Sequence, residues 1–181
     1  SLNGIRFTAA GAGTKTAGLV FGGLEPTKLD LTETYNGTAF TEVNNLNTAR
    51  AQLGGAGTQT AALAFAGQAA PGVTAVAETW NGTNWTNVNS MNQLRRGIAG
   101  AGTNTAALGF GGYSTNVPGS SGFTEIWNGT TWSNDADMSV AREAIAGFGT
   151  STSAVAAGGN IAPVTAVTEE FTKPGILTKT L

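Results

Sequence analysis

The chain has 181 residues, a formal charge of −2, 40% hydrophobic residues and only 11% charged residues. The nine Lys and Arg residues are spread thinly, which argues against the clustered basic surface that nucleic-acid binding requires. The absence of Cys and His excludes thiolate metal sites, cysteine nucleophiles and histidine general bases, and no apolar run is long enough for a membrane span. Most enzyme classes are therefore excluded.

The sequence contains four copies of one repeat, recognised by a Gly-Thr-x-Thr motif whose glycines are spaced by 44, 45 and 47 residues. Those glycines are Gly13, Gly57, Gly102 and Gly149. A second marker is an aromatic residue, followed by Asn-Gly-Thr in the first three copies: Tyr35, Trp80, Trp127 and Phe171. Five residues later stand Phe40, Trp85, Trp132 and Ile176. Four copies in one register predict a repeat architecture.

Each repeat has the pattern of four β-strands, as the third copy illustrates. A first strand is expected at about 95–102 and a second at about 105–111, where Leu108 and Phe110 alternate. A third strand carries Glu125-Ile126-Trp127, and a fourth begins at Trp132. Asn-Gly between the last two predicts a two-residue type I′ hairpin turn. The unit is therefore expected to be a four-stranded antiparallel meander, and Gly is too frequent for long helices.

This pattern resembles kelch repeats: Met or Leu, then Arg, a strand of small residues, an apolar strand ending in Gly-Gly, an aromatic residue and a Trp. The resemblance covers the whole chain and is nearest in texture to the Ala/Gly/Thr/Asn-rich kelch-like arrays of bacteriophage and marine viral structural proteins. The second copy departs from it with Ala66-Gly67, and the fourth has Ile176 in place of Trp and lacks Asn-Gly. The resemblance implies an all-β fold, a kelch-like β-propeller of four four-stranded antiparallel blades.

The blades are expected at about 1–45, 46–90, 91–137 and 138–181 within a single domain. Two arrangements are open: a closed four-blade ring or a segment of a longer array. The divergence of the fourth copy is typical of a terminal repeat, and the small residues of the first strands suit a narrow axis. Both features favour the closed ring.

Registered charges occur at two positions of every copy. The arginines are Arg6, Arg50, Arg95 and Arg142, and the glutamates are Glu33, Glu78, Glu125 and Glu169. In a chain with so few charges, this registration predicts Arg–Glu salt bridges that specify register. A ring of catalytic carboxylates, or of arginines binding an anion, is the alternative.

The remaining candidate chemistry has structural explanations. The four tryptophans are expected to fill blade interfaces rather than stack on sugars, because they repeat in register. Asn36, Asn81, Asn84 and Asn128 match the glycosylation pattern, although turn chemistry explains three of them. Asp135 and Asp137 are too few ligands for calcium. We expect no enzyme activity, no metal and no cofactor.

Recognition is expected on the loops between the second and third strands and between consecutive repeats. These loops differ among the copies: the separation from the strand-ending glycine to the registered Glu is 10, 11, 13 and 10 residues. Variable loops on a rigid scaffold are where binding is usually found. The expected binding face comprises Gln68, Arg96, Tyr113, Asn116 and Asn160.

These features favour a non-enzymatic virion or cell-surface propeller that binds a receptor, a glycan among the candidates, or a partner protein. The expected partners are other virion or surface proteins, or a host glycan or receptor, and a homo-oligomer is also open. Neither nucleic acid nor membrane insertion is expected. The alternatives are a purely structural spacer or decoration module of a viral particle and a kelch-type protein-interaction adaptor.

Overall fold

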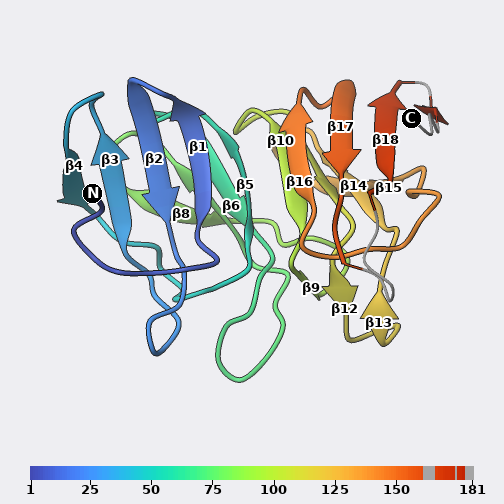
Figure 1. Cartoon of the computed structure of the whole chain (residues 1–181), viewed down its shortest axis with the longest axis horizontal. Coiled ribbons are helices and arrows are strands. Elements are labelled where there is room, and N and C mark those ends of the chain that lie inside the picture. Colours follow the sequence, from blue (N-terminus) through green and yellow to red (C-terminus); the bar gives the residue numbers. More distant parts are fainter. Residues whose placement is uncertain (161–165, 174, 178–181) are drawn as a thin grey trace.

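Figure 1 shows a computed structural model of the chain, which is built of β-strands joined by turns and loops. The structure describes residues 1–160 and 166–173, and the backbone of 175–177. No helix occurs in these residues, and the all-β expectation is confirmed.

Sixteen of the strands form four sheets, numbered I to IV here in chain order. Sheet I contains β1 (Ala10–Thr14), β2 (Ala17–Phe21), β3 (Thr32–Tyr35) and β4 (Phe40–Val43). Sheet II contains β5 (Gly54–Gly57), β6 (Ala62–Phe65), β7 (Ala77–Trp80) and β8 (Trp85–Val88). Sheet III contains β10 (Ala99–Gly102), β11 (Ala107–Phe110), β14 (Thr124–Trp127) and β15 (Trp132–Asp135). Sheet IV contains β16 (Ala146–Gly149), β17 (Ser153–Ala157), β18 (Thr168–Thr172) and β19 (Gly175–Leu177).

Every sheet is an antiparallel meander whose strands follow chain order, as the repeat pattern predicts. The first strands of successive sheets lie against one another: β1 contacts β5, β5 contacts β10, and β10 contacts β16. These strands approach closely because they are made mainly of Gly and Ala. The sheets therefore pack in series, each against the next.

The hydrophobic core is divided into three clusters, one between each pair of successive sheets. Aromatic rings join sheets across them: the Phe21 and Trp85 ring centroids are 5.0 Å apart, and those of Phe65 and Trp132 are 5.1 Å apart. Trp80 and Trp127 are only 1% exposed. The prediction that the tryptophans fill interfaces between sheets is confirmed.

The expected closed ring of four blades is not found. Within the described residues, β16 and β1 do not make the extensive contacts that join the first strands of successive sheets. Sheet IV has Ala157 where sheets I to III have Phe21, Phe65 and Phe110, so it lacks the ring that each of those sheets places against the next one. The series of sheets is therefore open at sheets I and IV.

A fifth, three-stranded sheet lies beside sheet III and was not predicted. It contains β9 (Arg95–Arg96), β12 (Tyr113–Ser114) and β13 (Gly119–Ser120), in the order β13-β12-β9. The single first strand expected at 95–102 is divided because Gly97, at φ +62°, turns the chain between β9 and β10. In Figure 1 this sheet lies at the lower end of the molecule, where the β2–β3 and β6–β7 loops also lie. We call this end of the molecule the loop end.

The Asn-Gly turns at the opposite end differ from the expected type I′ form. Tyr35 pairs directly with Phe40, which leaves a four-residue loop between β3 and β4. Gly37 has φ +93°, whereas Asn36 does not have a positive φ. Its side chain instead accepts hydrogen bonds from the amides of Thr38 and Ala39, each 2.9 Å long. The five-residue spacing of the paired aromatic residues therefore determines the length of this loop.

Candidate functional site

A buried ion pair lies inside each of the four sheets. Arg6 contacts Glu33, and the distances from Arg Nη2 to Glu Oε1 are 2.9 Å for Arg50–Glu78, 2.8 Å for Arg95–Glu125 and 2.8 Å for Arg142–Glu169. All eight side chains are at most 2% exposed. The predicted Arg–Glu salt bridges are confirmed, and each joins two residues of one repeat.

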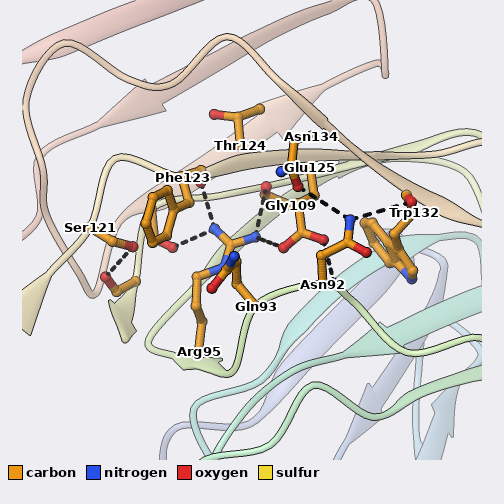
Figure 2. A network of polar contacts seen from close by, with 12 residues as sticks. Asn92, Gln93, Arg95, Gly109, Ser121, Phe123, Thr124, Glu125, Trp132 and Asn134 are labelled. Atoms are coloured by element: carbon orange, nitrogen blue, oxygen red, sulfur yellow. Dashed lines mark hydrogen bonds and ion pairs between the residues drawn. The ribbon is translucent and has the colours of Figure 1, made fainter. Parts of the chain in front are cut away.

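The pair in sheet III shows what these arginines hold in place (Figure 2). Arg95 Nη1 donates to the carbonyl oxygens of Gly111, at 2.8 Å, and Phe123, so it joins the two ends of the loop from β11 to β14. Glu125 Oε2 accepts a 2.6 Å hydrogen bond from the Asn92 amide, in the segment that enters the repeat. The ion pair therefore fixes both the loop and the entry segment to β14.

Burial changes the pKa of two of these arginines. Desolvation lowers the pKa of Arg50 and of Arg95, and the attraction and hydrogen bond of the paired glutamate oppose this shift. The Nε atom of all four registered arginines has no hydrogen-bond partner among the described residues. Since both members of each pair are shielded from solvent, the pairs can hold structure but cannot reach a ligand at the surface.

The three-stranded sheet has reduced equivalents in the other repeats. The residue after each registered arginine pairs with the residue after the strand-ending glycine: Phe7 with Leu24, Ala51 with Gln68, Arg96 with Tyr113, and Glu143 with Asn160. In the first three repeats the loop then folds back to pair again, as Gln68 does with Val73. Each repeat thus presents a short β-ribbon at the loop end, and its side chains differ from repeat to repeat.

Arg96 and Tyr113 of the expected binding face lie together in this ribbon. The Arg96 guanidinium carbon lies 4.6 Å from the centroid of the Tyr113 ring. Arg96 also donates to Gln52 Oε1 at 3.0 Å and lies 3.5 Å from Glu143 Oε2. Arg96 is therefore the centre of a polar cluster that joins sheets II, III and IV.

Of the other members of the expected face, Asn160 adjoins that cluster, because its backbone pairs with that of Glu143. Gln68 and Asn160 pair through their backbones in the ribbons of sheets II and IV. Asn116 is exposed at the tip of the β12–β13 turn, where its side-chain amide donates to Gln93 at 3.3 Å. Val117, which the sequence reading did not select, is 60% exposed beside it. Its position next to Pro in the longest loop could have identified Val117 as exposed from the sequence.

A hollow of about 280 Å³ opens where the four first strands converge. Corresponding positions of all four repeats line it: Thr8, Gln52, Gly97 and Ala144, each followed by a nonpolar residue. Gln52 and Glu143 were not predicted as site residues, because their closeness to Arg96 depends on how neighbouring sheets pack. The hollow has a mainly nonpolar lining, and it adjoins the Arg96 cluster through Gln52 and Glu143.

Two classes of feature are missing from the part of the chain that the structure describes. It contains no group of three or more His, Cys, Asp or Glu residues placed to hold a metal ion. It also contains no helix long and apolar enough to cross a membrane.

No protein-family model matches this sequence, and no curated protein matches it significantly.

Proposed function

We propose that the four sheets are consecutive blades of a kelch-like β-propeller. Three observations support the proposal: each sheet is a four-stranded meander, the first strands pack in series, and one buried Arg–Glu pair recurs in every sheet.

We further propose that the chain is a non-enzymatic binding module of a virion or an extracellular surface that engages its partner through the loop end. The partner is a surface protein, a host receptor or a glycan, and no cofactor takes part. The observation that carries this proposal is the contrast between the two ends. The turns at one end repeat Gly-Thr in all four copies and Asn-Gly in the first three, whereas the ribbons at the other differ in charge, size and loop length.

The buried ion pairs explain how variable loops can be held on one scaffold. Three of the four arginines bind both ends of their loop, as Arg50 does through Ala66 and Val76, so the tip can vary without loss of the anchor. In sheet III the anchored loop carries Asn116 and Val117 into solvent. An exposed amide beside an exposed apolar group suits a polyol or peptide partner.

The alternative function is a structural spacer or decoration module, or an interaction adaptor of the kelch type. It is favoured by exposed apolar residues away from the loop tips: Ile5 is 85% exposed and Phe148 is 59% exposed. Exposed apolar side chains mark contact surfaces where they form a contiguous patch.

A glycan array separates these two functions. We expect the intact chain to retain specific glycans and the double variant Asn116→Ala/Val117→Ala to lose them, with no change in melting temperature. The matched control is Thr38→Ala/Thr83→Ala, two exposed residues in the turns of the opposite end. If no glycan is retained, or if the control loses binding while the loop variant keeps it, glycan recognition by the loop end is wrong.

A further inference from the structure

The interfaces inside the molecule show what one sheet requires of the next. The phenyl ring of each sheet lies against a glycine of the following one: Phe21 on Gly55, Phe65 on Gly100 and Phe110 on Gly147. A Cβ atom at these glycines would lie 2.9, 2.7 and 2.6 Å from the ring, so only glycine fits there. The corresponding glycine of sheet I is Gly11, where the nearest atom is a backbone oxygen of its own sheet at 3.4 Å. Among the described residues, none occupies the place of a preceding sheet.

A chain of backbone hydrogen bonds follows the same series around the hollow. The Gln52 amide donates to Thr8 oxygen at 2.9 Å, the Gly97 amide to Gln52 oxygen at 2.8 Å, and the Ala144 amide to Gly97 oxygen at 2.8 Å. Within the described residues no backbone hydrogen bond uses the Thr8 amide or the Ala144 carbonyl. The two ends of the series therefore offer the donor and the acceptor of one more bond of the same kind.

The outer face of sheet I offers the apolar surface that sheets II and III bury. In sheet II, the residues that face the preceding sheet include Leu46, Leu53 and Trp85, which are 3 to 5% exposed. Their counterparts in sheet I, Leu2, Ala9 and Phe40, are only partly buried. Ile5 is 85% exposed, whereas its counterpart Leu94 packs against the core between sheets II and III.

The outer face of sheet IV is apolar in part, with its aromatic residue in a different place and with the exposed Glu170 where sheet III has Ile126. In sheet III the positions facing the next sheet hold Ala101 and Phe110, both about 4% exposed. Sheet IV has Phe148 and Ala157 in their places, and Phe148 is 59% exposed. In sheet IV the phenyl ring is therefore on the first strand instead of the second. It projects from the outer face of the sheet, which no other sheet of the described residues covers and which we call the open face.

We propose that the open face of sheet IV in one molecule binds the open face of sheet I in a second copy of this chain, head to tail. The contact continues the internal series of interfaces, with Ala144 oxygen accepting from the Thr8 amide of the next molecule and Phe148 covering its Gly11 face. Two different surfaces meet, so the contact is heterologous: it closes into a ring if the rotation permits and otherwise continues as a filament. This assembly is independent of recognition by the loop end.

Sedimentation and light scattering over a range of protein concentrations test the proposal. The intact chain is expected to associate, and Phe148→Glu and Ile5→Glu are each expected to weaken association at least about tenfold, because each places an unpaired charge in an apolar contact. Val117→Glu is the matched control: Val117 is 60% exposed but lies on the loop tip, away from both open faces. A monomer at every concentration, or a control as defective as the two variants, overturns the proposal.

A mixture of the two variants distinguishes a head-to-tail contact from a symmetric one. Phe148→Glu retains an intact sheet I face and Ile5→Glu an intact sheet IV face, so the mixture should associate although neither variant does alone. Failure of the mixture to associate overturns the head-to-tail assignment. Loop-end glycan binding is measured separately on the same variants and is expected to be unchanged.

Cysteine pairing supplies a second measurement that does not depend on affinity. The natural chain has no cysteine, so Thr8→Cys and Ala144→Cys in separate molecules introduce one thiol each. The proposed hydrogen bond brings these residues within the Cα separation that a disulfide spans. Random pairing of equal amounts already gives about twice as much mixed dimer as either symmetric dimer. Oxidation of the mixture should yield the mixed disulfide dimer well beyond that ratio, and a purely statistical distribution contradicts the proposal.

Discussion

The buried indole N–H of Trp132 lacks a hydrogen-bond acceptor, and one substitution is expected to supply it. Trp132 is 6% exposed, and its Nε1 has no hydrogen-bond partner in the described part of the chain. The equivalent Trp85 donates from Nε1 to Thr32 Oγ1 of the preceding sheet at 3.0 Å. At the position equivalent to Thr32, sheet II has Ala77, which has no acceptor in its side chain. Ala77→Thr should therefore supply the missing acceptor.

The size of the gain follows from the two sites. A buried donor without a partner costs roughly 1–3 kcal/mol, and a typical internal hydrogen bond contributes about 1 kcal/mol net. Thr32 and Ala77 have the same register, opposite the second and fourth strands of their sheets, and both are fully buried, so threonine already fits this environment once. We expect Ala77→Thr to raise the free energy of unfolding by about 1 kcal/mol and the melting temperature by roughly 2–4 °C.

Urea denaturation followed by tryptophan fluorescence and by circular dichroism measures this gain. The matched control is the same substitution in a Trp132→Phe background, where the indole donor is absent and no hydrogen bond can form. A double-mutant cycle with a coupling energy near zero, or an Ala77→Thr variant no more stable than the natural chain, would refute the reasoning. The converse change, Thr32→Ala, should destabilise sheet I against sheet II by a similar amount.

Two further predictions concern the buried pairs and the strand-ending glycines. Arg95→Met should lower the free energy of unfolding by about 3–5 kcal/mol, because Glu125 is left buried without a partner. Arg95→Met/Glu125→Leu should recover most of that loss. Urea denaturation measures both variants, and a double variant as unstable as Arg95→Met contradicts the prediction. Gly111→Ala should unfold at a clearly lower temperature than Gly119→Ala in calorimetry: both glycines have a positive φ, but a Cβ at Gly111 would lie 2.2 Å from Ile145 Cδ1, whereas nothing lies within 4 Å at Gly119. Equal melting temperatures for the two variants would rule out that close contact as the cause.

Features that depend on one repeat alone could be predicted from the sequence. Four strands per unit follow from alternation and turn residues within about 45 residues, and the pairing of Arg95 with Glu125 follows from registered charges in a chain that has few others. The burial of Trp80 and Trp127 follows in the same way, because a repeated aromatic residue must be covered by the next unit.

Features that depend on how repeats meet were decided only by the tertiary structure. Arg96 was expected on the binding face, but its contacts with Gln52 and Glu143 of the neighbouring repeats were not foreseen. The series is open, although four repeats favoured a closed ring, because closure depends on the angle between sheets. That angle is set by side chains from two different repeats, such as the phenyl ring of Phe65 against Gly100. Periodicity within one repeat determines its own hydrogen bonds, whereas packing between repeats sums many small contacts that no local pattern records.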